Sequence, residues 1–119
     1  MSDVTELRFE GAEEPFDLDD FVEPEYEAEQ TIDERFAAFH AANPWVYRTL
    51  ERLAADWLER GHRKVGIKAL FEVIRWQHGR RTSGDQGFRC NNDFTSRYAR
   101  ILLERHPEWP IETRRLRAA

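Results

Sequence analysis

The chain has few side chains of the kinds that carry out catalysis or bind metal ions, and their spacing matches no catalytic or metal-binding motif. Its four histidines, His40, His62, His78 and His106, lie far apart, and none stands in an HExxH spacing with an acid. Cys90 is the only cysteine, so it has no internal disulfide partner, and no signature of an activated nucleophile surrounds it. We expect no enzyme, no metal site and no cofactor. We expect His40 at a helix end and both His78 and His106 near helix C-termini, where positive charge is favourable.

Cations and asparagines offer a different chemistry, the recognition of nucleic acid. Arginine and lysine contact phosphates and guanine, and asparagine pairs with adenine. An alternative remains open, because Asp93 with Arg97 and Arg100 with Glu104 can pair at i,i+4 on an ordinary solvated helix. Neither GxGxxG nor the GxxxxGK phosphate-binding loop is present. The candidate nucleic-acid contacts are Arg63, Lys64, Arg80, Arg81, Asn91, Asn92, Arg97 and Arg100.

Charge is divided very unevenly along the chain. Residues 1–34 hold 14 acidic side chains against the single Arg8, whereas residues 35–119 hold 17 Lys and Arg against 9 Asp and Glu. Such asymmetry is typical of proteins that contact nucleic acid, or that use an acidic arm to bind something basic.

Residues 1–30 lack a sustained helical or alternating period, and we expect an acidic arm that is mostly disordered. Apolar residues spaced among its acids leave a second interpretation open, a short motif that docks on a basic, partly apolar groove. These residues are Phe9, Phe16, Leu18, Phe21, Val22 and Tyr26. A helical domain over residues 31–110 and a basic tail over residues 111–119 would follow.

The segment from Val65 to His78 is apolar on most sides of a helical wheel. Its polar stripe is narrow, consisting of Lys68, Glu72 and Arg75. We therefore predict a buried central helix, covered by amphipathic helices over residues 44–60 and 93–106. The apolar set includes Ile67, Leu70, Phe71, Val73, Ile74 and Trp76.

Local signals predict where the other helices begin and end. Thr31-Ile32-Asp33-Glu34 is a capping box. Asn43 is expected to cap the next helix, with Pro44 at its first position and Gly61 just after its end. Asn91 or Asn92 can cap the last strong helix.

The predicted fold is all-α, a small four-helix domain that could be an elaborated helix-turn-helix or winged helix. The glycine-rich residues 79–90 forbid a regular helix; Phe88 to Cys90 could form a short strand, or simply an anchor with Phe88 packing inward. About a dozen residues separate the last two helices, whereas a simple helix-turn-helix has a turn of about 3–4. We expect Trp109 to fold back over the core.

One pattern resembles a family of small proteins of tailed phages and prophages. It consists of FxxFHxxNPxVYxxL from Phe36, GIKALFEVIRW from Gly66, Asn91-Asn92 and SRYAR from Ser96. The resemblance covers roughly residues 35–115 and implies a genomic setting, with no activity attached to it. In that setting, small proteins bind nucleic acid or inhibit a host protein.

Two functions are therefore expected. The first is a small phage-type protein that binds nucleic acid, such as duplex DNA, or has a regulatory role. Its acidic arm would compete with the nucleic acid for its basic face. The alternative is an interaction protein that inhibits a host protein, using the arm as a nucleic-acid mimic or docking segment. The chain shows neither a signal peptide nor an apolar run of bilayer length, so we expect a cytoplasmic protein that contacts no membrane.

Overall fold

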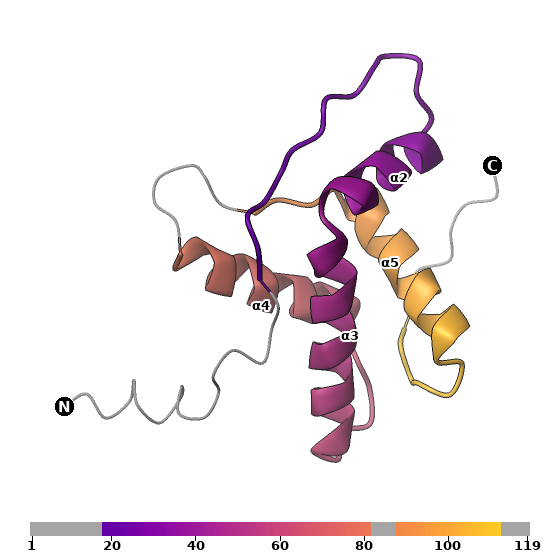
Figure 1. Cartoon of the computed structure of the whole chain (residues 1–119). Coiled ribbons are helices and arrows are strands. Elements are labelled where there is room, and N and C mark those ends of the chain that lie inside the picture. Colours follow the sequence, from indigo (N-terminus) through magenta and orange to yellow (C-terminus); the bar gives the residue numbers. More distant parts are fainter. Residues whose placement is uncertain (1–17, 82–87, 113–119) are drawn as a thin grey trace.

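The computed structural model describes residues 18–81 and 88–112, and within those ranges the protein is all-helical (Figure 1). The helices are α2 (Ile32–Ala42), α3 (Pro44–Glu59), α4 (Ile67–Gly79) and α5 (Asn92–Arg105). Each helix packs on two others, α3 on α2 and α4, and α5 on α4 and α2. The four-helix prediction is confirmed. None of the described helices combines the length and apolarity that a membrane crossing needs.

The helix ends follow their local sequence signals. In the capping box, the Glu34 amide donates to the Thr31 hydroxyl at 3.1 Å and the Thr31 amide donates to the Glu34 carboxylate at 2.9 Å. Gly61 follows the end of α3 with φ +95°, a conformation that costs glycine little. Asn91 caps α5 by accepting from the Asp93 amide at 2.6 Å. These three predictions are confirmed. Each feature depends only on residues within one turn of the chain, which is why the sequence indicates it.

The prediction of a buried central helix over residues 65–78 holds for one side of that helix, and its apolar surface is less completely covered than expected. α4 buries Leu70, Phe71, Ile74 and His78, but Val73 is 38% exposed and Trp76 is 61% exposed. α3 and α5 cover α4 on one side only, so part of its apolar surface has no described neighbour. α3 is the helix with the most buried residues: Trp45, Val46, Tyr47, Thr49, Leu50 and Ala54.

The acidic arm is not disordered throughout, because its residues 18–30 lie in an extended course along the helices (Figure 1). Leu18, Phe21 and Tyr26 pack against the core. The ring of Phe21 lies 6.0 Å from that of Phe39 and 5.3 Å from that of Phe88. Apolar side chains face the core while the acids remain exposed, so burial stabilises a segment that composition alone marks as disordered. Residues 1–17 lie outside the described part.

Asn43 holds the arm in place instead of capping α3. Its side chain makes no capping hydrogen bond, although Pro44 does occupy the first turn as expected. The Asn43 amide is fully buried; its oxygen accepts from the Val22 backbone amide at 2.8 Å, and its nitrogen donates to the Val22 carbonyl at 2.7 Å. The nitrogen also lies 3.2 Å from the Phe39 carbonyl. One buried side chain thus pairs with both polar groups of the Val22 backbone.

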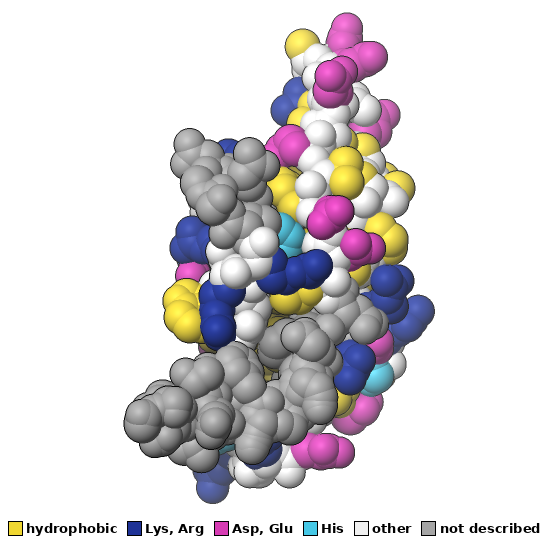
Figure 2. Space-filling model, turned by 60° about the vertical axis from the view of Figure 1, so that its left-hand side comes forward, with side chains coloured by type: hydrophobic (Ala, Val, Ile, Leu, Met, Phe, Trp, Pro, Cys, Tyr) yellow, Lys and Arg dark blue, Asp and Glu magenta, His cyan; other side chains and the backbone are white. Residues whose placement is uncertain are grey.

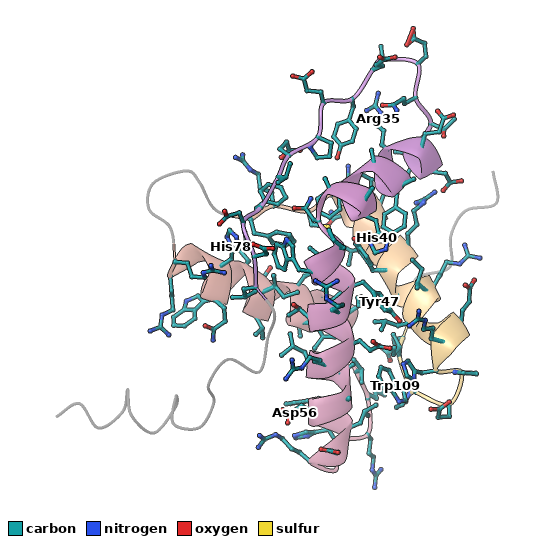
Figure 3. The ribbon with its side chains drawn as sticks, viewed as in Figure 1. Arg35, His40, Tyr47, Asp56, His78 and Trp109 are labelled. Atoms are coloured by element: carbon teal, nitrogen blue, oxygen red, sulfur yellow. The ribbon has the colours of Figure 1, made fainter. Side chains whose placement is uncertain are left out.

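His78 provides a second anchor for the arm (Figure 3). It is 2% exposed, and its ring stacks on Trp45 with centroids 5.6 Å apart. Its Nε2 lies 3.0 Å from the Asp19 carbonyl oxygen, which can only accept, so Nε2 carries the proton and donates. The expectation that His78 merely occupies a helix C-terminus, where positive charge is favourable, therefore missed its buried anchoring role.

The C-terminal residues close the fold on the opposite side of α3. Trp109 stacks on His106 with centroids 3.8 Å apart and packs against the core, as predicted. The Val65 amide donates to the Pro110 carbonyl at 3.0 Å, and Val65 forms an isolated parallel bridge with Ile111, which is buried. Ile111, placed in the predicted basic tail, therefore belongs to the folded domain. Phe88 packs inward as expected, and no strand forms at residues 88–90.

Replacing Asn43 should test whether the arm is part of the fold. Asn43→Ala removes both bonds to Val22 and should lower the free energy of unfolding by about 2–3 kcal/mol. The exposed Asn92 provides a matched control, because Asn92→Ala should cost less than about 0.5 kcal/mol. Urea denaturation of the full chain measures both. Equal, small losses would show that the bonds between Asn43 and Val22 contribute nothing to stability.

Candidate nucleic-acid interface

The eight predicted contact residues lie in three separate places. Arg63 and Lys64 are in the connection between α3 and α4, and Arg80 and Arg81 follow the end of α4. The remaining four are at the start of α5 or along it: Asn91, Asn92, Arg97 and Arg100.

Several of these side chains already have structural partners. Lys64 pairs with Glu112 at 3.1 Å, and Asn91 caps α5. The Arg97 side chain is only 23% exposed, and its Nε lies 2.7 Å from Asp33 in α2. The pairing of Arg97 with the Asp93 carboxylate, offered as an alternative by the sequence, is replaced by this contact between helices. Arg97 therefore joins α2 to α5 and is a weak candidate for a phosphate contact.

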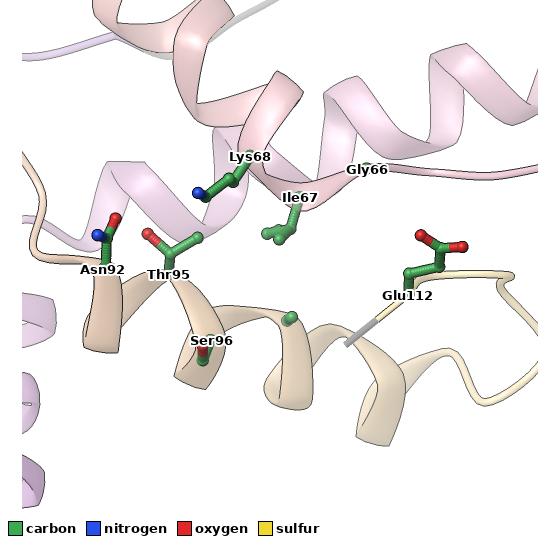
Figure 4. Close-up of a pocket in the computed structure, with 8 residues that line it drawn as sticks. Gly66, Ile67, Lys68, Asn92, Thr95, Ser96 and Glu112 are labelled. Carbon is green, nitrogen blue, oxygen red and sulfur yellow. The ribbon is translucent and has the colours of Figure 1, made fainter. Parts of the chain in front are cut away.

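The structure reveals a more continuous surface along α4, made of three adjoining hollows. The first, of about 410 Å³, lies between the start of α4 and the first turns of α5 (Figure 4). The second is about 380 Å³ and the third about 530 Å³. Lys68, Asn92 and Thr95 line both the first and the second, while Glu72 and Arg75 line both the second and the third. We call this surface the α4 groove; its polar and aromatic lining is Lys68, Phe71, Glu72, Arg75, Trp76, Arg80, Phe88, Arg89, Cys90, Asn92, Thr95, Ser96 and Glu112.

Helical geometry explains why these residues line one surface. Lys68, Glu72, Arg75 and Trp76 stand at positions i, i+4, i+7 and i+8, which share one face of a helix. The buried residues of α4 occupy the other side. α5 contributes Asn92, Thr95 and Ser96 from its first two turns, so the opposite wall of the groove is polar and short-chained.

The α4 groove is cationic. Lys68, Arg75, Arg80 and Arg89 line it, against Glu72 and, at one end, Glu112. Arg75 donates to both Glu72 carboxylate oxygens, at 3.0 and 3.2 Å, and both side chains are more than half exposed. An exposed pair of this kind contributes little, so Arg75 can exchange its partner for a phosphate at low cost. Figure 2 shows acidic side chains gathered at the upper tip of the molecule and lysine and arginine side chains lower on that face.

The thiol of Cys90 is partly buried. Burial raises the pKa of the Cys90 thiol to about 12, so the nucleophilic thiolate does not form near neutral pH. Among the described residues, no three His, Cys, Asp or Glu side chains are grouped as metal ligands would be.

One acid-base cluster was not visible in the sequence. His106 Nε2 lies 2.7 Å from the Glu51 carboxylate, and the Tyr47 hydroxyl donates to the same oxygen at 3.4 Å. Burial, followed by the charge of Glu51, raises the pKa of Tyr47 to about 12. Trp109 stacks on His106, and the Arg105 guanidinium lies over the Tyr47 ring at 5.4 Å (Figure 3). Trp109 covers the cluster at His106 and Arg105 covers it at Tyr47. Through these contacts the C-terminal residues pack on α3.

Sequence reasoning did not assign Lys68, Arg75, Trp76 and Arg89 to a site. A signal for the first two was present, because Lys68, Glu72 and Arg75 were the recognised polar stripe of this helix. Trp76 was assigned to the core on hydrophobicity alone, and nothing local distinguishes Arg89.

Comparison with known proteins adds no assignment. No protein-family model, curated protein or solved structure matches the chain. The resemblance to proteins of tailed phages stays a prediction.

Proposed function

We propose that this protein is a small, non-enzymatic nucleic-acid-binding protein that takes the phosphate backbone of its ligand into the α4 groove. The observation that carries the proposal is a set of four cations, Lys68, Arg75, Arg80 and Arg89, that line the three adjoining hollows. A row of cations spaced along a groove matches a row of phosphates, and its neutralisation releases counterions. The resemblance to phage proteins, with the regulatory role expected in that setting, agrees with this proposal.

The opposite wall supplies neutral hydrogen-bonding groups. Asn92 and Ser96 line the first hollow, and their amide and hydroxyl can donate to phosphate or sugar oxygens while the cations supply the attraction. The contact helix is therefore α4, with the start of α5 beside it. This differs from the predicted contact surface along α5, where Arg97 is engaged by Asp33.

Charge reversal should locate the contact surface. In the full chain, Lys68→Glu with Arg75→Glu should weaken nucleic-acid binding and reduce the salt dependence of affinity by a log–log slope of about 2, because each lost phosphate contact removes about one unit. The control, Arg48→Glu with Arg52→Glu on α3, makes the same charge change elsewhere. Fluorescence anisotropy over a salt series measures both, and thermal unfolding checks the fold. Equal weakening by the two pairs would contradict a site in the groove.

The N-terminal residues can modulate this site. Residues 1–17 hold six acids against Arg8, and they join the described chain at Leu18, beside the Asp19 carbonyl that His78 binds near the end of α4. A polyanion tethered there competes with nucleic acid at high effective concentration. Residues 1–17 thus lower the affinity of the groove for nucleic acid.

Neutralising these six acids should raise the affinity for nucleic acid. The change replaces each Asp or Glu in residues 1–17 by its amide in the full chain, which leaves residues 18–30 intact. A matched control neutralises six exposed acids elsewhere: Asp20, Glu25, Glu29, Glu59, Glu104 and Glu108. Anisotropy titrations should show the larger gain for the N-terminal set. Equal gains would mean that net charge alone is responsible, and that residues 1–17 do not compete with nucleic acid for the groove.

One observation favours the alternative of an interaction protein. The acids of residues 19–29 are all exposed, and among the described residues none of them has an ion-pair partner. Because Asn43 and His78 fix this segment, it presents an ordered row of carboxylates that suits a basic host protein. Inhibition of such a protein becomes the preferred function if the full chain binds no nucleic acid in a salt-dependent way.

A further inference from the structure

An exposed tryptophan stands at one end of the α4 groove. Trp76 is 61% exposed, more than any other large hydrophobic side chain in the described part of the chain. It lines the third hollow together with Glu72, Arg75, Gly79 and Arg80. The Arg80 guanidinium lies over its ring, 5.2 Å from the centroid.

A single exposed apolar side chain does not by itself indicate a binding site, but Trp76 lies beside the cations of the α4 groove. It follows directly on Arg75 and lies on the face that carries Lys68. Lys68 and Trp76 are eight residues apart, or roughly 12 Å along the helix. A nucleic-acid backbone of this length holds a few phosphates. Arg80 contacts the ring, so the indole is restrained while most of its surface remains open to solvent.

We propose that the α4 groove binds single-stranded nucleic acid, with one base stacked on the indole of Trp76 and the neighbouring phosphates on Arg75 and Lys68. The inference rests on the proposed function and specifies its ligand. In a duplex, the bases stack on one another and show only their edges in the grooves, so a side chain reaches a base face only after unstacking. A single strand offers its base faces freely, and a cationic track with an aromatic ring is the arrangement that binds such strands without sequence preference.

The charge of the groove favours this occupant over a protein. Its cations outnumber its acids, and the Glu72 carboxylate is already shared with Arg75. A polyanion with flat apolar groups matches both properties of the surface. An acidic protein would match the charge, and would match the indole only where it placed an apolar side chain beside its carboxylates.

Substitution of Trp76 should separate single-stranded from duplex binding. The probes are a short fluorescein-labelled oligothymidine and the same strand annealed to oligoadenine, titrated with the full chain. Trp76→Ala should weaken binding of the single strand about tenfold, as expected for a lost stacking contact, and change duplex binding little. Trp76→Phe should restore most of the loss because it restores an aromatic face. Val73→Ala, at the half-exposed apolar residue on the same helix, should have no effect.

Intrinsic fluorescence gives a second readout that a merely structural role would not change. Bound oligothymidine should quench part of the tryptophan emission of the native chain, and Trp76→Phe should remove that part. Thermal unfolding of each variant checks that it is folded.

Two results would overturn the inference and leave the proposed function standing. The first is an unchanged affinity of Trp76→Ala for the single strand. The second is an equal loss of affinity of Trp76→Ala for the single strand and the duplex. In both cases charge reversal at Lys68 and Arg75 would still weaken binding. Absence of salt-dependent binding to either probe would instead remove the proposed function itself. Binding of the groove to an acidic protein, unaffected by either oligonucleotide, would assign this surface to a protein partner.

Discussion

The side chain of Asn43, fully buried where α2 meets α3, holds the backbone of Val22 through two hydrogen bonds. Breaking them would leave the fully buried Asn43 side chain without its partners on Val22, so release of the arm costs free energy. The same clamp keeps Phe21 between Phe39 and Phe88. An acidic segment thereby becomes part of an aromatic core. Together with His78, the clamp also fixes Asp19 beside the C-terminal end of α4.

Features of the fold that depend on a single turn could be predicted from the sequence. The capping box at Thr31, Pro44 at the start of α3 and Gly61 after its end all involve neighbours in the chain. The partners of Asn43 and His78 are 21 and 59 residues away, and no local pattern indicates them. Asn43 has the ideal residue type for a helix cap, yet the tertiary hydrogen bonds to Val22 take precedence.

The candidate site was predictable in part. Its cationic character follows from the charge of residues 35–119, and the stripe of Lys68, Glu72 and Arg75 follows from helical spacing. Hydrophobicity placed Trp76 in the core, because a helical wheel shows how wide an apolar face is but not how much of it is covered. Arg97 was predicted as a nucleic-acid contact because nothing near it in the sequence indicates its partner. That partner, Asp33 in α2, is 64 residues away. The folded chain thus separates its charges, with acids along the arm and cations along α4.

The central claim is that the ligand contacts α4 and the start of α5, while residues 18–30 serve the fold. An amide NMR titration of the isotope-labelled full chain with oligothymidine tests this claim most directly, because it locates contacts without mutation. The account predicts the largest shift changes at residues 67–80 and 89–96 and at the Trp76 indole, with little change at Val22 or along α3. Changes centred on Arg63 and Lys64, or on Arg97 and Arg100, would contradict it.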